Sequence, residues 1–476
     1  MGSMFAALTT TGNSLDVLER AISVVQNNVS NSATPGYVTQ SLQLNASRFD
    51  PSQGVWGGVE AGNVESARNT FAEQSVWSAN QQVGSATQQT TSLQSLNSLF
   101  NVSGTSGIPG ALSTLYSAFS AWSTSPTSTT AQQQVLNAAT GVAQAFNSVA
   151  SGVASVRSSA VTQTKSAVTQ INQLSSQIAT LNGEIRNGGQ NDSGLQAQLY
   201  NNLEQLSNYA NISVQPASDG TVSVLMEGQV PLVIGQTSMA LQETNTNPSS
   251  STSNAAPDQQ ILASDGRDVT SLIQGGQLGG LLQVTNSVIP SLIGDGTQQG
   301  SLNLLAQKVA DTVNGLLATG QTGASQTATP LFTYTGGSPT TVAGSLGVTS
   351  NFSTTQLVAA DPGPPAVANG IASQLAQLQN PTAAADMING SSYSDYYSSV
   401  AANVGTLEST ASQTQTAQTA ALTQAQSTRS QLSGVSLNDQ AAILLQFQEA
   451  YQASSQALST IHSTLQYFMQ SMQSVT

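Results

Sequence analysis

The C-terminal stretch decides the fold; from Leu444 to Val475 it reads LLQFQEAYQASSQALSTIHSTLQYFMQSMQSV. Two interleaved series of mostly apolar residues run through it with a spacing of seven, which is the seam of a coiled-coil helix. One series is Leu444, Tyr451, Leu458, Leu465 and Met472, and the other is Phe447, Ser454, Ile461, Phe468 and Val475. The pattern predicts a long helix whose apolar face needs a partner.

Residues 1–30 carry the same seven-residue spacing. The two series are Leu8, Leu15, Ile22 and Val29, and Met4, Thr11, Leu18 and Val25. This helix should end at Thr34-Pro35-Gly36, because proline cannot continue a helix and glycine permits the turn. We predict that the N- and C-terminal helices pair as a coiled coil and form a terminal assembly domain from residues 1–48 and 433–476.

The middle of the chain is predicted to be a rod of long helices, because apolar residues recur three and four apart in five segments. These segments are residues 71–100, 131–186, 195–209, 302–318 and 393–432. Segment 131–186 lacks proline and should form one or two long helices. We assign residues 49–210 and 286–432 to this helical rod domain.

Strand signals gather between residues 211 and 285. Two alternating apolar runs, at residues 212–214 and 222–226, flank Asp219-Gly220, a dipeptide typical of a type I′ hairpin turn. This pattern predicts a β-rich subdomain over residues 211–285, inserted in the rod.

Residues 320–365 are expected to be irregular, with short alternating pieces such as residues 341–348, and are a candidate for a reduced outer domain. The expected fold class is mainly α with a β-rich subdomain, paired terminal helices and a rod-like middle of long helices.

The composition excludes several classes of partner. The 476 residues include 9 Lys and Arg against 23 Asp and Glu, for a net charge of −14. Such a chain has no basic surface for nucleic acid or for anionic membranes. Neither a signal peptide nor an apolar run long enough to span a bilayer is recognisable. We expect a soluble protein that is exported, if at all, without a cleaved signal.

Residues able to do chemistry are scarce. The chain has no cysteine and one histidine, His462, which falls in the C-terminal seam region. The glycine run Gly275–Gly280 lacks the lysine and spacing of a phosphate loop, and predicts a tight turn where backbone segments approach closely. Asp265 and Asp268 flank Arg267, which favours a loop ion pair over a cation site. We therefore expect no catalytic, metal or cofactor site and no enzyme.

The terminal seams should be an assembly interface. Two helices bury too little apolar surface to offset the entropy of ordering them, so the seams need other subunits. An ordinary intramolecular bundle core remains the alternative. The predicted interface residues are Leu8, Leu15, Leu18, Ile22, Val25, Val29, Leu444, Phe447, Tyr451, Leu458, Ile461, Leu465 and Phe468.

The segment in which the first helix ends is NNVSNSATPGY, residues 27–37. It resembles the N-terminal signature of flagellar axial proteins, the family of rod, hook and hook-associated subunits. The matching signature residues are Asn27, Asn28, Asn31, Thr34, Pro35, Gly36 and Tyr37, whereas Ser30, Ala33, Val38 and Thr39 depart from the usual pattern. The stretch GVSLNDQAA at residues 434–442, with residues 445–454, resembles the other end of that family. Within it, the resemblance is strongest to the hook-associated protein 1 family.

This resemblance implies a secreted structural adaptor at the hook–filament junction of the bacterial flagellum. It implies export through the flagellar type III apparatus, with an export chaperone on the C-terminal helix. The implied partners are the hook protein, the second hook–filament junction protein and copies of the chain itself in a ring.

Three other readings stay open. A hook or distal rod subunit shares the N-terminal signature but should carry more β structure. A flagellin or second junction protein shares the coiled-coil ends but not the turn. A secreted Ser/Thr-rich surface adhesin would explain the composition but should carry a signal peptide or an anchor.

Overall fold

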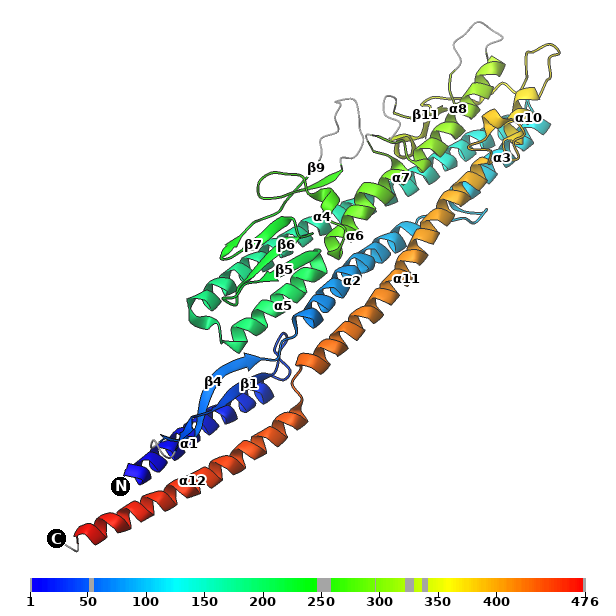
Figure 1. Cartoon of the computed structure of the whole chain (residues 1–476). Helices are drawn as coiled ribbons and strands as arrows, with labels where there is room; N and C mark the ends of the chain where they lie inside the picture. The colour runs from blue at the N-terminus through cyan, green and yellow to red at the C-terminus, as the bar shows by residue number, and fades with distance from the viewer. Residues whose placement is uncertain are drawn as a thin grey trace.

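The molecule is an elongated rod, and the start of its first helix and the end of its last helix lie at the same tip (Figure 1). The computed structural model describes residues 2–50, 55–245, 258–295, 297–321, 329–335 and 341–473. The expected fold class is confirmed: long helices dominate, and small antiparallel sheets lie on one side of the rod.

The two terminal helices pair side by side, as the seven-residue spacing predicts, and they run in opposite directions. They are α1 (Gly2–Ser30) and α12 (Leu437–Gln473). The Tyr451 hydroxyl donates to Glu19 Oε1 at 2.9 Å, and the Asn28 amide donates to Gln440 Oε1 at 2.9 Å. Residues late in α1 therefore meet residues early in α12, which fixes an antiparallel register.

A β-hairpin that the sequence analysis missed follows α1 and packs against it. Its long strands pair antiparallel, and a bulge between Leu42 and Leu44 interrupts the register. The extra residue lies in the second long strand, between Ala61 and Val64, and breaks the two-residue alternation by which strands are recognised in a sequence. The strands are β1 (Gln40–Ala46) and β4 (Val59–Ser66), with the short pair β2 (Phe49–Asp50) and β3 (Val55–Trp56).

The rod is built on long helices, and all five predicted helical segments are present. Segment 131–186 forms a single helix of 56 residues that ends in a π-helical turn. Helix α3 was missed, because Gly107, Pro109 and Gly110 suggest a loop, yet proline is tolerated in a first helical turn. The elements are α2 (Thr70–Asn97), α3 (Gly107–Thr124), α4 (Thr129–Glu184), η2 (Ile185–Gly189), α5 (Ser193–Tyr209), α7 (Ile289–Ile293), α8 (Ser301–Gln321), α10 (Gly370–Gln377), η8 (Ala384–Asp386) and α11 (Tyr393–Ser433).

The strands predicted within residues 211–285 form a four-stranded antiparallel sheet, β5-β6-β7-β8, beside a two-stranded pair. The expected type I′ turn is wrong: Gly220 has φ +82° but Asp219 has no positive φ, because five residues, 217–221, link the strands. The elements are β5 (Ile212–Pro216), β6 (Val222–Met226), β7 (Val230–Ile234), β8 (Thr237–Ser238), β9 (Gln242–Asn245), β10 (Gln259–Leu262), η3 (Thr270–Leu272), α6 (Gly276–Gln283) and η4 (Val284–Val288).

The glycine run at Gly275–Gly280 does allow close backbone approach, but it starts helix α6 and is not a loop turn. A Cβ on Gly276 would lie 2.4 Å from the backbone of Tyr209 and Ala210, and one on Gly280 would lie 2.5 Å from Ser85 O. Glycine here lets α6 pack against α5 and α2.

The described part of residues 320–365 is irregular, as expected. Residues 342–345 form a helical turn, which corrects the alternating reading of residues 341–348. Residues 322–328 and 336–340 lie outside the described chain. The elements are β11 (Phe332–Thr333), α9 (Val342–Ser345), β12 (Gly347–Val348) and η7 (Thr354–Gln356).

Two apolar cores run along the rod. The core distant from the termini lies among α3, α4, α8, α10 and α11 around Phe119, Trp122 and Phe146. The second joins the four-stranded sheet and α6 to α5 and the later half of α4. Because the sheet and the helices share this core, we propose that the β-rich segment is part of the rod. We also propose that the terminal unit extends to Ser66, since a boundary at residue 48 would divide the hairpin.

Candidate assembly site at the terminal helices and their junction with the rod

Helix α12 lacks the cover that a helix of its length normally has. Of its 37 residues, only Gln440 and Leu465 are buried. The predicted interface residues Leu444, Phe447, Tyr451, Leu458 and Ile461 are partly buried, whereas the Phe468 side chain is 44% exposed. These residues face the same side of α12 as Gln440, so α1 covers this face incompletely.

Helix α1 is covered more completely than α12, but most of the residues that it buries are not the predicted interface residues. From residue 4 onward, its buried side chains are Val17, Ala21, Val25 and Asn28. Of the predicted residues, Leu8, Leu15, Leu18 and Ile22 are partly buried, Val25 is buried and Val29 is 39% exposed. The buried residues differ from the predicted ones because α1 packs against both α12 and the hairpin, and these two neighbours cover more than one side of the helix.

Exposed apolar side chains concentrate in this terminal unit, which consists of α1, the hairpin and α12. Among the described residues, it carries ten of the sixteen large apolar side chains that are exposed. Isolated exposed apolar residues are common, but such a concentration marks an interaction surface. The ten are Phe5, Val29, Leu44, Phe49, Leu437, Leu445, Tyr467, Phe468, Met469 and Met472.

The signature segment, residues 27–37, forms the end of α1 and a turn, which we call the signature turn. Asn28 is the centre of its hydrogen bonds. Its amide nitrogen donates to Gln40 O at 2.8 Å and to Gln440 Oε1 at 2.9 Å. Its oxygen accepts from Gln40 N at 2.9 Å and from the Tyr37 hydroxyl at 3.0 Å. All four hydrogen-bonding positions of the amide are used, so one buried side chain ties α1 to the turn, to β1 and to α12.

The other signature residues shape the turn itself. Asn31 donates to Asn27 O at 3.0 Å, and the Thr34 hydroxyl donates to Asn31 Oδ1 at 3.1 Å. Gly36 has φ +77°, and a Cβ there would lie 2.2 Å from Ala197 O in α5. Burial raises the pKa of Tyr37, which a hydrogen bond with Ser193 partly opposes. The turn therefore rests directly on the rod.

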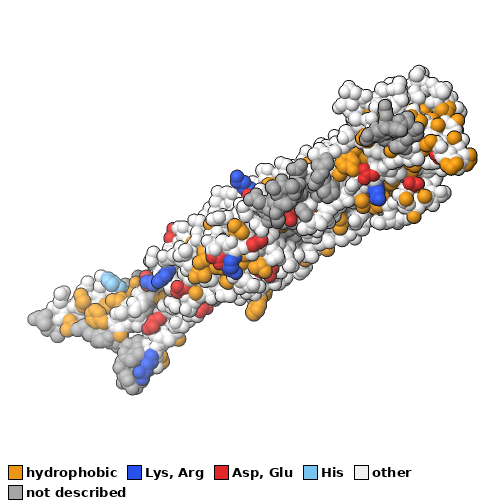
Figure 2. All heavy atoms as spheres, turned by 90° about the horizontal axis from the view of Figure 1, so that it is seen from above, with side chains coloured by type: hydrophobic (Ala, Val, Ile, Leu, Met, Phe, Trp, Pro, Cys, Tyr) orange, Lys and Arg blue, Asp and Glu red, His pale blue; other side chains and the backbone are white. Residues whose placement is uncertain are grey.

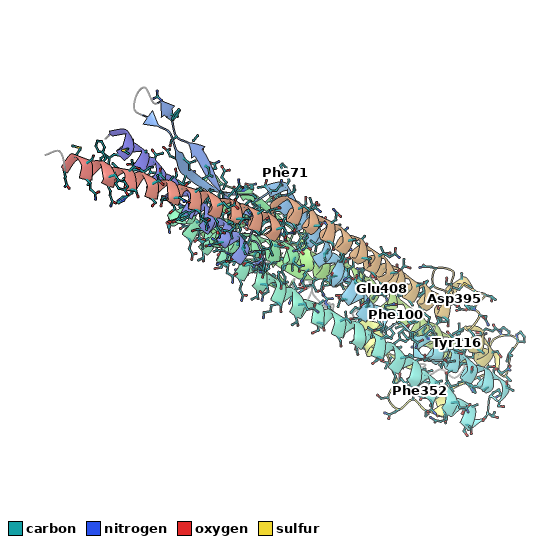
Figure 3. All side chains as sticks on the ribbon, turned by 90° about the horizontal axis from the view of Figure 1, so that it is seen from below. Phe71, Phe100, Tyr116, Phe352, Asp395 and Glu408 are labelled. Atoms are coloured by element: carbon teal, nitrogen blue, oxygen red, sulfur yellow. The ribbon has the colours of Figure 1, made fainter. Side chains whose placement is uncertain are left out.

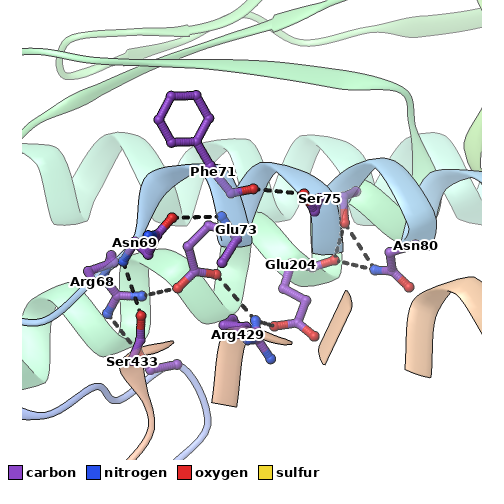
Figure 4. A network of polar contacts seen from close by, with 12 residues as sticks. Arg68, Asn69, Phe71, Glu73, Ser75, Asn80, Glu204, Arg429 and Ser433 are labelled. Carbon is purple, nitrogen blue, oxygen red and sulfur yellow. Dashed lines mark hydrogen bonds and ion pairs between the residues drawn. The ribbon is translucent and has the colours of Figure 1, made fainter. Parts of the chain in front are cut away.

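A partly buried ionic cluster, missed by the sequence analysis, lies beside the turn (Figure 4). Glu73, only 2% exposed, contacts Arg68 at 2.6 Å and Arg429 at 3.2 Å, and Arg429 also contacts Glu204 at 2.6 Å. Burial would lower the pKa of Arg429, but Glu204 and Glu73 raise it above its usual value. We call these four residues the junction cluster; apart from Arg68 and Glu73, its members are far apart in the sequence, so no local pattern reveals it.

Other polar contacts also cross the junction. Thr39 N donates to Ser433 O at 3.0 Å, and Asn69 N donates to the Ser433 hydroxyl at 3.1 Å. A polar cavity of about 260 Å³ lies between the turn and the end of α11, lined in part by Thr34, Glu73 and Arg429. Close by, Phe71 projects from the start of α2 and is 78% exposed (Figure 3).

No cluster of side chains suited to catalysis appears in the described residues. His462 is exposed on α12, and the described ranges hold no group of three or more His, Asp or Glu able to bind a metal. Arg267 forms a loop ion pair with Asp265 at 2.7 Å, which confirms the prediction. Charged side chains are scattered on the face in Figure 2, without a broad basic area. Among the described helices, none has the length and apolar character needed to cross a membrane.

Comparison with known proteins identifies the family. No curated protein matches the chain. A solved structure, the flagellar hook junction protein FlgK from Burkholderia pseudomallei, is 25% identical with a TM-score of 0.48. That match covers 55% of this chain and 47% of the relative, about half its length. The family model for the flagellar hook-associated protein FlgK helical domain matches residues 93–332, which is half of the chain. The chain therefore belongs to the family of the flagellar hook-associated protein FlgK.

Proposed function

We propose that this protein is a structural adaptor that joins hook and filament in the bacterial flagellum. The observation that carries this proposal is α12, which has 37 residues of which two are buried. A helix of this length is stabilised mainly by the packing of its apolar face. Further copies of the chain would supply that packing, and family membership supports a flagellar assembly as their setting.

The proposed partners follow from this role. Copies of the chain form a ring through the terminal units, with the hook protein on one side and the second hook–filament junction protein on the other. The interface residues predicted on α1 and α12 are proposed to bury against neighbouring subunits.

Export is also part of the proposal. The chain would leave the cell through the flagellar type III apparatus and act outside it, with a chaperone covering α12 beforehand. The exposed apolar side chains of α12 support a need for such cover before assembly. We propose no enzymatic activity.

The test adds purified protein to isolated hooks and counts capped ends by electron microscopy. The wild type should cap hooks. Leu458→Asp should abolish capping while the rod stays folded, because assembly would bury an unpaired charge. His462→Ala, an exposed change on the same helix, is the matched control and should cap normally. Wild-type protein that does not bind hook ends would refute the proposal.

A further inference from the structure

We propose that Arg68 sets the orientation of the terminal unit relative to the rod. Arg68 lies in the short link between β4 and α2, where the chain passes from the terminal unit into the rod. It is absent from the signature turn and from the predicted interface. Its importance for assembly rests on the proposed function, whereas its control of orientation does not.

The guanidinium group of Arg68 contacts both sides of the junction. One nitrogen, Nη2, donates to Gly36 O at 2.7 Å, and Gly36 belongs to the turn of the terminal unit. The other, Nη1, donates to Glu73 Oε1 at 2.6 Å, and Glu73 belongs to α2 of the rod. The side chain is 7% exposed, so water competes little for these bonds.

An aromatic ring fixes the plane of the same group. The Arg68 Cζ atom lies 3.6 Å from the centroid of the Tyr200 ring on α5. Tyr200 is in turn stacked on Trp77 of α2, with ring centroids 5.9 Å apart. A planar guanidinium held over a fixed ring can donate in only a few directions, and one of these is towards Gly36 O.

The rod side of this contact is rigid. Glu73 also binds Arg429 on α11, and Arg429 binds Glu204 on α5. The cluster thus joins three rod helices, and Arg68 is the member that reaches the turn. Because α2 and α5 hold Arg68 in place, its guanidinium is a hydrogen-bond donor of fixed position. The Gly36 carbonyl must lie at that position to accept the bond.

Orientation matters because the terminal unit is a long lever. Helix α12 has 37 residues and is about 55 Å long at about 1.5 Å per residue. A tilt of about 10° at the junction would therefore move its tip by about 10 Å, about the spacing of packed helices. Copies whose terminal units varied by this amount could not present one common surface to a ring.

The experiment measures the orientation by electron paramagnetic resonance. The chain has no cysteine, so spin labels attach only at introduced cysteines. One pair, Gln177→Cys in α4 and Gln448→Cys in α12, reports the distance between rod and terminal unit. A second pair, Gln177→Cys and Ala420→Cys, reports a distance within the rod. All three positions are exposed.

Arg68→Gln should at least double the width of the distance distribution between rod and terminal unit and leave the distribution within the rod unchanged. Arg20→Gln is the matched control, because Arg20 forms only an exposed pair with Asp16, and it should change neither distribution. Arg68→Lys should widen the first distribution as well, since an ammonium group cannot replace the planar donor.

Two results would overturn the proposal. One is an Arg68→Gln distribution as narrow as that of wild type; the other is widening within the rod, which would make Arg68 a stabiliser of the rod core. Tyr200→Leu removes the ring without leaving a buried charge and should also widen the first distribution; no change would overturn the role of the ring. In the hook assay, Arg68→Gln should lower the fraction of capped ends. Failure of wild-type capping would refute the proposed function and leave the distance result standing.

Discussion

Replacing Asn28 by alanine should loosen the junction between α1, β1 and α12. The change removes four hydrogen bonds at a buried position. At about 1 kcal/mol net for each bond, and allowing the Tyr37 hydroxyl and the Gln440 amide to find water, the loss is about 3 kcal/mol. The backbone of Gln40 has less freedom to adapt and should account for most of it.

Hydrogen exchange of the Gln40 amide is the assay that isolates this effect, since Asn28 Oδ1 accepts its proton at 2.9 Å. A loss of about 3 kcal/mol corresponds to exchange that is about 100-fold faster, at about 1.4 kcal/mol for each factor of ten. Asn27→Ala is the matched control, because the Asn27 side chain contacts Asn31 within the same turn. Unchanged protection at Gln40, or equal acceleration by Asn27→Ala, would refute the reasoning.

Three more predictions concern backbone fit and growth. Gly36→Ala should destabilise the protein by about 2 kcal/mol or more, seen in thermal unfolding, because it adds a positive-φ strain to a 2.2 Å clash with Ala197 O. Gly12→Ala, with no atom within 4 Å of the added Cβ, should instead stabilise α1 by about 0.5–1 kcal/mol. In sedimentation experiments the protein alone should stay monomeric at moderate concentration, and on hooks it should add one short layer, since a junction subunit must prefer different partners above and below. Long homopolymers formed without hooks would count against the junction role.

The sequence predicts well those elements whose apolar spacing is regular over many residues. Helices α4, α8, α11 and α12 all carry sustained three-and-four or seven-residue spacing, and each was located. The pairing of the two ends also follows from matching seams. Regular spacing works here because the apolar residues of each helix lie along one stripe, even where several elements cover that stripe, as for α4.

The sequence fails where cover comes from more than one side or where the local pattern is broken. Helix α1 lies against both α12 and the hairpin, so Val17 and Ala21 are buried although they belong to neither predicted series. The hairpin was missed because β4 carries an extra residue between Ala61 and Val64, the partners of Leu44 and Leu42, and this residue shifts the alternation of β4 by one.

The candidate site was half visible in the sequence. The signature turn could be found through its family resemblance. In the structure, its asparagines form hydrogen bonds that hold the turn, and its glycine adopts a positive φ. The junction cluster could not be found, because Glu73, Glu204 and Arg429 are separated by more than a hundred residues and meet only after folding. Electrostatic pairs between distant segments leave no periodic trace.

The position of both chain ends at the same tip has a mechanical consequence. Tension applied to the tip of the terminal unit divides between two covalent paths, one through α12 into α11 and one through α1 into the turn and hairpin. Thr39 ties these paths together, since its N–H bonds Ser433 O at 3.0 Å and its hydroxyl bonds Gly434 O at 2.8 Å. Pulling one helix alone would load this cross-tie in shear, so the two helices should yield together.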